Sequence, residues 1–185
     1  MKTHNLEACS FARSATLVLA AIIWPAAVSA QQNMKACNLL TAAELSAAIG
    51  GTVGHAAGIF TPRNSYRAGD FWSCEQTVGS RTVRIFCNTL PVTEEGKRLA
   101  QEQRDRYGKQ GYQILERELG GSRCATTVLQ AGAKDMLGIV GTSCEHQKGP
   151  YHVIVAVGAT GPNDLVPMEN VASLIEKAAS RVPAQ

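Results

Sequence analysis

The cysteines are the residues of this sequence with the most evident chemistry. One of the six, Cys9, lies near the N-terminus, and the others are Cys37, Cys74, Cys87, Cys124 and Cys144. No pair has the C-x-x-C spacing of a thioredoxin-like redox site, and no cysteine is followed by the histidine of a haem-attachment motif. We therefore expect structural disulfides, which are typical of exported proteins.

The five cysteines after Cys9 cannot all pair with one another. We expect one bridge between Cys74 and Cys87 and a second between Cys124 and Cys144, because each pair falls on neighbouring predicted strands. A Cys37–Cys74 bridge is the alternative to the first of these. In the expected connectivity Cys37 keeps its thiol, which is then free or joined to another chain.

The register of one predicted hairpin bears directly on the first bridge. A two-residue loop at 80–81 places Cys74 opposite Cys87. A type II′ loop at 79–80 instead places Cys74 opposite Ile85. The sequence leaves both registers open.

Two histidines near a predicted turn, His146 and His152, could serve as metal ligands or as a general base. Side chains alternate along a strand, so Cys144 and His146 share one face whereas Glu145 points to the other. Fewer than three ligands converge, and we expect no metal site. A hydrolase with His146 or His152 as its base stays an alternative hypothesis.

The remaining motifs do not indicate a recognisable catalytic site. The stretch 153–164 resembles a glycine-rich nucleotide turn, but Gly158 and Gly161 lack the third glycine and too little chain follows them. The sequence has no G-x-S-x-G elbow, no P-loop and no H-E-x-x-H motif. We therefore assign no catalytic residue and no cofactor.

A loop predicted over residues 59–70 carries an exposed mixture of basic and aromatic side chains. Together with a tryptophan just after the loop, these residues are our candidates for a surface that binds a partner. The four candidates are Arg63, Tyr66, Arg67 and Trp72.

The N-terminus predicts export. Lys2 and Arg13 flank a polar opening, a short apolar run follows over 15–24, and the small residues Val28 and Ala30 stand three and one positions before Gln31. This pattern is typical of a secretory signal peptide over 1–30, and the apolar run is shorter than a spanning helix needs. Residues 31–185 then form a single domain, periplasmic or secreted, with no transmembrane helix.

The charges of the chain are nearly balanced and interspersed. There are 18 Lys and Arg residues against 15 Asp and Glu residues, a formal net charge of +3. This distribution gives no electrostatic footprint for nucleic acid or for an anionic membrane.

Three helices and about six or seven strands are expected. Thr41 and Glu44 form a capping box for a helix that ends at Gly50-Gly51, and Thr93 caps a charged surface helix running to about Gly108. Apolar residues at helical spacing predict a last helix from about Asp164. Strands are predicted at 53–58, in a hairpin over 71–90, at 112–116, and in runs starting at 124, 136 and 151. The element order predicts an α+β fold, an antiparallel sheet covered by helices.

The start of the predicted domain carries a resemblance. Its matching residues are Cys37, Leu39, Leu40, Thr41, Glu44, Gly50-Gly51 and Val53-Gly54. They resemble a group of small exported bacterial proteins of unknown function whose mature N-terminus reads Cys-x-Leu-Leu-Thr-x-x-Glu, and some of these are lipoproteins with a PsbP-like α/β sandwich. The resemblance implies such a sandwich and implies no activity. Met34, Lys35 and Ala36 do not form a lipobox before Cys37, so a lipid anchor is not implied.

These observations favour an exported, disulfide-stabilised, non-enzymatic domain that binds an envelope protein or a small ligand. The alternatives are an envelope hydrolase with an unrecognised site and a structural protein cross-linked through its odd cysteine. We expect either a monomer or a cysteine-linked dimer, and the cross-linked structural protein predicts the dimer.

Overall fold

The computed structural model of the chain describes residues 36–63, 69–91, 93–133 and 138–183. The predicted signal peptide lies outside these residues. Within the described ranges, no helix combines the length and the apolar character needed to cross a membrane.

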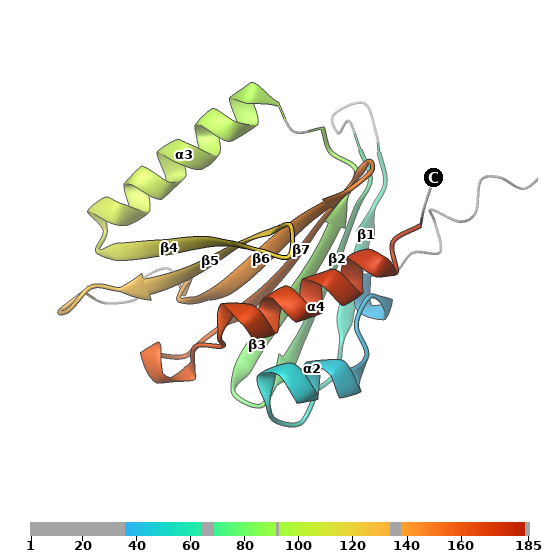
Figure 1. Cartoon of the computed structure of the whole chain (residues 1–185), viewed down its shortest axis with the longest axis horizontal. Helices are drawn as coiled ribbons and strands as arrows, with labels where there is room; N and C mark the ends of the chain where they lie inside the picture. The colour runs from blue at the N-terminus through green and yellow to red at the C-terminus, as the bar shows by residue number, and fades with distance from the viewer. Residues whose placement is uncertain (1–35, 64–68, 92, 134–137, 184–185) are drawn as a thin grey trace, which may run out of the picture.

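In the described residues, seven strands form one antiparallel sheet (Figure 1). Their order across the sheet is β1-β2-β3-β7-β6-β5-β4, so two runs of consecutive strands meet where β3 pairs with β7. The strands are β1 (Ala57–Thr61), β2 (Phe71–Val78), β3 (Arg81–Asn88), β4 (Tyr112–Leu119), β5 (Ser122–Leu129), β6 (Gly141–Lys148) and β7 (Tyr151–Gly158). The predicted α+β class is confirmed.

Three α-helices accompany the sheet in the part of the chain that the structure describes. They are α2 (Ala42–Ile49), α3 (Glu94–Lys109) and α4 (Met168–Ser180), with short 3-10 helices η1 (Ala36–Asn38) and η2 (Pro162–Asp164). Helices α4 and α2 lie together on one face of the sheet, while α3 stands over its other side beside β4 (Figure 1). We call the face under α4 the core face and the opposite one the outer face.

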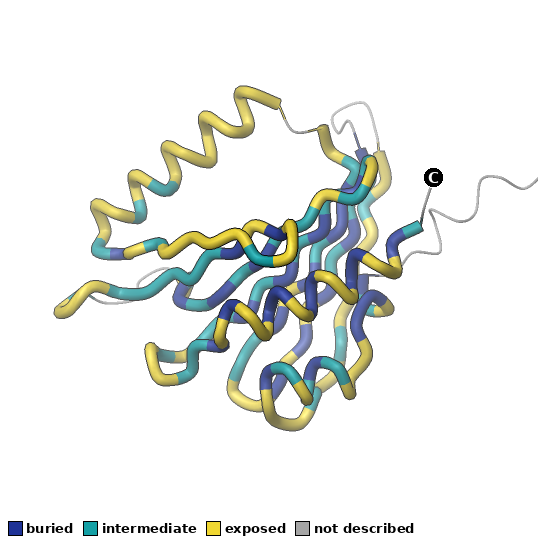
Figure 2. Tube along the Cα trace, in the orientation of Figure 1, coloured by how far each residue is buried: buried dark blue, intermediate teal, exposed yellow. Residues whose placement is uncertain are grey.

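Alternation along the strands creates the core. In β7 every second residue is fully or almost fully buried, namely Tyr151, Val153, Val155 and Val157. Helix α4 presents its buried stripe to this face, namely Val171, Leu174, Ile175 and Ala178. Burial is accordingly concentrated between α4 and the sheet, whereas α3 is exposed along most of its length (Figure 2).

The predicted helix caps are confirmed. The Thr41 hydroxyl accepts a hydrogen bond from the Glu44 backbone N–H at 3.2 Å, and the Glu44 carboxylate accepts one from the Thr41 N–H at 2.9 Å. Thr93 caps α3 by accepting a bond from the Gly96 N–H at 3.0 Å. Such side chains satisfy N–H groups that a helix start leaves without intrahelical partners.

The structure resolves the open register of the β2–β3 hairpin. Gly79 adopts a φ of 60° in the turn, a left-handed conformation that costs glycine little. Cys74 is paired with Ile85, as the loop at 79–80 requires, and Cys87 is paired with Trp72. Cys74 and Cys87 are thus diagonal neighbours on the core face, not directly opposite residues.

The expected Cys74–Cys87 bridge is wrong, and the alternative bridge, Cys37–Cys74, is confirmed, so Cys37 is not the free thiol. Cys74 is bonded to Cys37, with a Cα–Cα distance of 5.0 Å, because η1 places Cys37 over the core face beside β1 and β2. Gly58 makes this approach possible because it has no side chain. A Cβ at that position would lie only 3.0 Å from the Cys37 sulfur, which is too close for ordinary packing. A chain cross-linked through Cys37 is therefore inconsistent with the structure.

The second bridge joins Cys124 to Cys144, the expected pair. The two residues lie directly opposite each other on β5 and β6, with a Cα–Cα distance of 4.0 Å. In the described residues the free thiol is Cys87, which is buried with 0% exposure.

Cys87 should resist alkylation in the folded protein. Burial raises the pKa of its thiol to about 12, so the reactive thiolate is scarce at neutral pH and the side chain is inaccessible as well. We expect no label on Cys87 under native conditions and complete labelling in denaturant without reductant, measured by peptide mass spectrometry. Labelling of Cys37 or Cys74 in unreduced protein would contradict the observed connectivity.

Some predicted element boundaries are shifted. The first strand lies at Ala57–Thr61, where it pairs with β2, so residues 59–61 belong to a strand and not to the predicted loop. Strand β6 begins at Gly141, later than the run from residue 136 suggested. Helix α4 begins at Met168, and η2 occupies the start expected near Asp164. These ends depend on pairing partners and prolines more than on local hydrophobicity.

An ion pair joins the end of α4 to the start of α2. Two nitrogens of the Arg181 guanidinium donate to the two carboxylate oxygens of Glu44, each at 2.7 Å. Arg181 also donates to the Leu39 carbonyl at 2.8 Å. The guanidinium therefore fastens the N-terminal segment to the last helix.

The stability of the protein should depend on the ionisation of Glu44. The hydrogen bonds from Arg181, followed by that from Thr41, lower the pKa of Glu44 from 4.5 to about 2. Glu44 is therefore protonated more readily in the unfolded chain than in the folded one. The stabilisation of the folded state by ionised Glu44 is complete above pH 4.5 and is lost as pH falls toward 2. In denaturant titrations across this window, the free energy of unfolding should fall more steeply for the wild type than for Glu44→Gln. Equal slopes would contradict the assignment.

Candidate binding groove

The outer face of the sheet is only partly covered in the described structure. Its side chains are mostly half-buried, in contrast to the fully buried residues of the core face (Figure 2). Apolar members on the central strands include Phe86, Ile154 and Ala156, which lie on adjacent strands β3 and β7. The element that overhangs this face is α3, above the β4 side (Figure 1).

Helix α3 carries a series of paired charged side chains along its exposed surface. Within its described residues none is buried. Lys97 pairs with Glu94 at 2.7 Å, and Arg98 pairs with both Glu95 and Glu102. Such pairs at i,i+3 and i,i+4 support a helix that buries no apolar stripe. The sequence prediction of a surface helix is confirmed.

Two contacts fasten α3 to the sheet. The rings of Tyr107 and Tyr112 meet edge to face, with centroids 6.0 Å apart, and Tyr112 is 2% exposed. One guanidinium nitrogen of Arg104 lies 3.3 Å from a carboxylate oxygen of Glu116 on β4. Both contacts go to the edge strand β4, so the helix is held at one border of the sheet and leaves the floor beside it open.

A cavity of about 330 Å³ lies between α3 and the outer face. The helix contributes Ala100, Gln103, Arg104 and Tyr107, and the floor includes Ala125, Ser143 and Ile154. A cavity of about 300 Å³ over the ends of β3, β6 and β7 shares Thr127 and Ser143 with it, and one of about 560 Å³ shares Gln103 and Tyr107. Because they share walls, we treat these three cavities as one site, the α3 groove.

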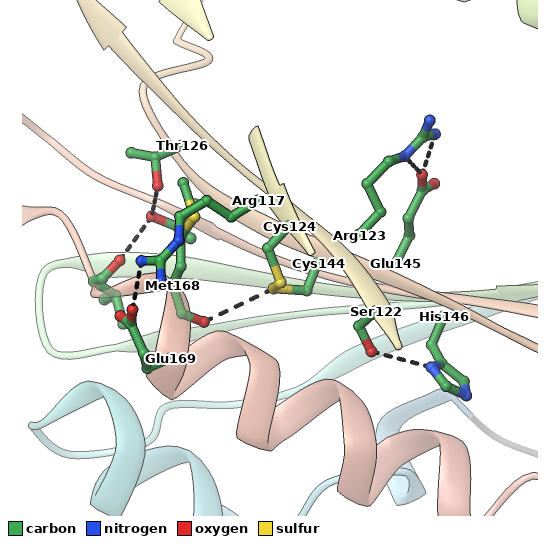
Figure 3. Close-up of a disulfide and its surroundings, with 12 residues drawn as sticks. Arg117, Ser122, Arg123, Cys124, Thr126, Cys144, Glu145, His146, Met168 and Glu169 are labelled. Atoms are coloured by element: carbon green, nitrogen blue, oxygen red, sulfur yellow. Dashed lines mark hydrogen bonds and ion pairs between the residues drawn. A yellow bond between two sulfur atoms is a disulfide. The ribbon is translucent and has the colours of Figure 1, made fainter. Parts of the chain in front are cut away.

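A charged cluster lies at the groove floor. The Arg123 guanidinium and the Glu145 carboxylate are paired, and His152 Nε2 lies 2.9 Å from the other oxygen of Glu145 (the Arg123–Glu145 pair is drawn in Figure 3). The hydrogen bond with His152, followed by the charge of Arg123, lowers the pKa of Glu145 despite its partial burial. Glu145 is therefore an ionised, paired carboxylate at neutral pH, unsuited to act as a general base.

The groove thus combines small apolar floor residues with polar groups on both walls. Arg104 and Glu116 on one side and Arg123 and Glu145 on the other offer charged donors and acceptors, and Ser143 adds a hydroxyl. Such a mixture suits a small polar organic molecule with an apolar portion, since a few placed polar groups orient a ligand over an apolar lining.

The four residues predicted to form a binding surface near residues 59–72 do not form one site in the described structure. Trp72 is only 1% exposed and lies on the core face, stacked on Phe60 with ring centroids 5.2 Å apart, so its assignment to a binding surface is wrong. Arg63 is exposed, and its backbone N–H donates to the Asp70 carboxylate at 2.7 Å. Tyr66 and Arg67 lie outside the described residues.

The two candidate histidines lie on opposite faces of the sheet. His146 Nδ1 is 3.0 Å from the Ser122 hydroxyl on the core face, whereas His152 belongs to the outer-face cluster (Figure 3 shows the Ser122–His146 pair). Ser122 is fully buried, and neither Ser122 nor His146 lines the α3 groove. The pair therefore does not belong to the groove, and His146 itself is half-buried. In the described residues, no three His, Cys, Asp or Glu side chains are grouped as metal ligands.

Sequence reasoning missed the residues that line the groove. One weak signal was present. Ser143 on β6 and Ala156 on β7 point to the outer face and are small, whereas solvent-facing strand positions commonly carry long polar side chains. A second weak signal is Tyr107, the one aromatic residue in the sequence of the charged helix predicted to run from Thr93 to about Gly108. Neither signal indicates which strands lie under the helix.

Comparisons with known proteins give a likeness of fold. The sequence matches no protein-family model and no curated protein. Its fold resembles the extracellular domain of PknH from Mycobacterium tuberculosis. The TM-score is 0.44 at 9% sequence identity, over 78% of this chain and 94% of that one. Independently, the two disulfides within the described residues favour an extracytoplasmic location.

Proposed function

We propose that this chain is an exported, non-enzymatic binding domain that takes a small polar ligand into the α3 groove. The observation that carries the proposal is the position of α3, which overhangs the outer face without burying a side chain of its own. A surface helix of sixteen residues in a compact domain ordinarily packs an apolar stripe on the core. Here it forms the wall of a cavity.

The size of the groove supports a small ligand. Its central cavity of about 330 Å³ falls within the ~300–1,000 Å³ typical of small-molecule sites. The floor is rigid, because the Cys124–Cys144 bridge ties β5 to β6 directly below it and Cys144 contributes to its lining. Because the floor is already ordered, the protein loses less conformational entropy when a ligand binds.

The compartment and the family of the chain are part of the proposal. The predicted signal peptide and the disulfides support a periplasmic or secreted protein. The Cys-x-Leu-Leu-Thr-x-x-Glu resemblance supports a relationship to the small exported proteins of unknown function. An envelope protein is the alternative occupant of the outer face, and the groove favours the small ligand because its central cavity has the size of a small-molecule site.

Nuclear magnetic resonance with a matched pair of variants tests the proposal. Small molecules extracted from the exported fraction should shift amide signals of α3 and of β4 to β7. Ser143→Trp fills the groove and should abolish these shifts. Gln147→Trp adds the same ring to the same face of β6 outside the groove and should preserve them. Shifts that persist in Ser143→Trp, or that map to the core face, would refute the proposal.

A further inference from the structure

The floor of the α3 groove is a belt of small side chains that runs across the strands. Ala156 of β7 is paired with Ser143 of β6, and Ser143 is paired in turn with Ala125 of β5, all on the outer face. The next row along the same strands consists of Gly158, Gly141 and Thr127. These residues line the two cavities that lie over the strands. Because no long side chain rises from the belt, a ligand can lie flat across the strands.

Ion pairs stand at both ends of the belt. At one end, Arg84 of β3 is next in register, and its Nε donates to the Glu75 carboxylate at 2.7 Å. At the other end, Glu116 of β4 is next in register and lies 3.3 Å from the Arg104 guanidinium. Neighbouring strands lie ~4.8 Å apart, so the distance from β3 across β7, β6 and β5 to β4 is about 19 Å. The site therefore suits an elongated ligand with polar groups near both ends.

The charges around the groove cancel. Besides the two end pairs, the ion pair of Arg123 and Glu145 borders the belt. The helix side adds one charge of each sign, at Glu102 and Arg106. A ligand is favoured where its potential complements that of the site, so a site of balanced charge favours a ligand without net charge.

Hydroxyl groups are the other polar feature of the floor. Those that line the cavity over the ends of β3, β6 and β7 include the hydroxyls of Ser80, Thr82, Thr127, Ser143 and Thr160. A hydroxyl both donates and accepts hydrogen bonds, and an ion pair places an accepting carboxylate beside a donating guanidinium. The matching ligand therefore carries donors and acceptors at closely spaced positions.

Given the binding function proposed above, we infer that the ligand of the α3 groove is an uncharged oligosaccharide. Two hydroxyls on neighbouring sugar carbons meet one ion pair together, since one donates to the carboxylate and the other accepts from the guanidinium. In a trans peptide unit the N–H and C=O point in opposite directions, so the unit does not present such a pair. The C–H face of a sugar ring packs on aromatic rings, and half-buried rings border the floor at Phe86, beside Ile154, and at Tyr107.

A microarray of immobilised glycans tests the inference with the fluorescently labelled mature protein. Binding should be confined to uncharged oligosaccharides, and glycans that carry sialic acids, uronic acids or free amino groups should give no signal. Isothermal titration calorimetry then measures the affinity for the uncharged glycan with the strongest signal. Failure to bind any uncharged glycan, or a preference for charged ones, would overturn the inference.

Two arginine variants serve as a matched pair in the calorimetry. Arg84→Ala removes a donor at the end of the belt and should weaken binding about tenfold, the effect of one hydrogen bond to a charged group. Arg117→Ala removes an arginine that is likewise paired with a carboxylate, at 2.8 Å from Glu169, but lies on the core face with Cys124. It should leave the affinity unchanged. Equal affinities in the two variants would contradict a saccharide bound along the belt.

Ser143→Trp separates this inference from the proposed function. The variant fills the groove and should lose the saccharide as well. If a charged molecule or a peptide shifts the amide signals of the groove in the wild type but not in Ser143→Trp, the binding function stands and the saccharide is wrong. If no ligand of any kind binds in the groove, both fail.

Discussion

Replacing both Cys37 and Cys74 with serine is expected to lower the free energy of unfolding by about 4 kcal/mol. The two residues are 37 positions apart, and a bridge across a loop of that length removes much of the freedom of the unfolded chain. The Cys124–Cys144 bridge closes a shorter loop of 20 positions and should contribute about 3 kcal/mol. Denaturant unfolding under non-reducing conditions measures both losses.

The double variant is needed because Cys74 and Cys87 are diagonal neighbours on the core face. A single Cys37→Ser change would leave two nearby thiols that can pair with each other. Cys87→Ala is the matched control, since it removes a buried sulfur without opening a bridge and should cost only about 1 kcal/mol. A double variant no less stable than this control would contradict the assigned connectivity.

Leu174→Ala in α4 should lower the free energy of unfolding by about 3 kcal/mol, whereas Leu99→Ala in α3 should change it by less than about 0.5 kcal/mol. Leu174 is completely buried under the sheet, and its truncation leaves a cavity. Leu99 is 51% exposed on a helix that buries no described residue. Both losses are measured by denaturant titration.

The two leucine variants control for each other. Each replaces leucine by alanine within an α-helix, so the intrinsic helix preference changes by the same small amount. Any difference between them therefore reports packing. Similar losses at both positions would mean that α3 is packed on the sheet, and the account of an open groove would fail.

Local signals made much of the fold predictable. The Thr41–Glu44 capping box and the Thr93 cap each act within a few residues, and each lies where the sequence placed it. The sequence left the turn of the β2–β3 hairpin open between residues 79–80 and 80–81, and the pairing of Cys74 with Ile85 selects the first. Side chains alternate along the predicted hairpin over 71–90, so Trp72 shares a face with Cys74, two residues on. That observation already indicated a buried tryptophan, and assigning Trp72 to a surface site overlooked it.

Contacts between distant segments account for what the sequence did not reveal. Cys74 pairs with Cys37 and not Cys87 because η1 folds back over β1 and β2, which no local pattern encodes. The α3 groove has the same origin. The last strand, β7, pairs with β3, so β6, β5 and β4 follow it in order toward the far edge of the sheet. This order brings Ser143 and Ile154 beside α3, a helix that precedes them in the sequence.

Native mass spectrometry of the protein recovered from its exported fraction tests the binding function most directly. We expect a non-covalent mass, beyond that of the polypeptide, on the wild type and on Gln147→Trp, and its absence from Ser143→Trp. The same additional mass on Ser143→Trp, or bare polypeptide in all three samples, would contradict a ligand in the α3 groove.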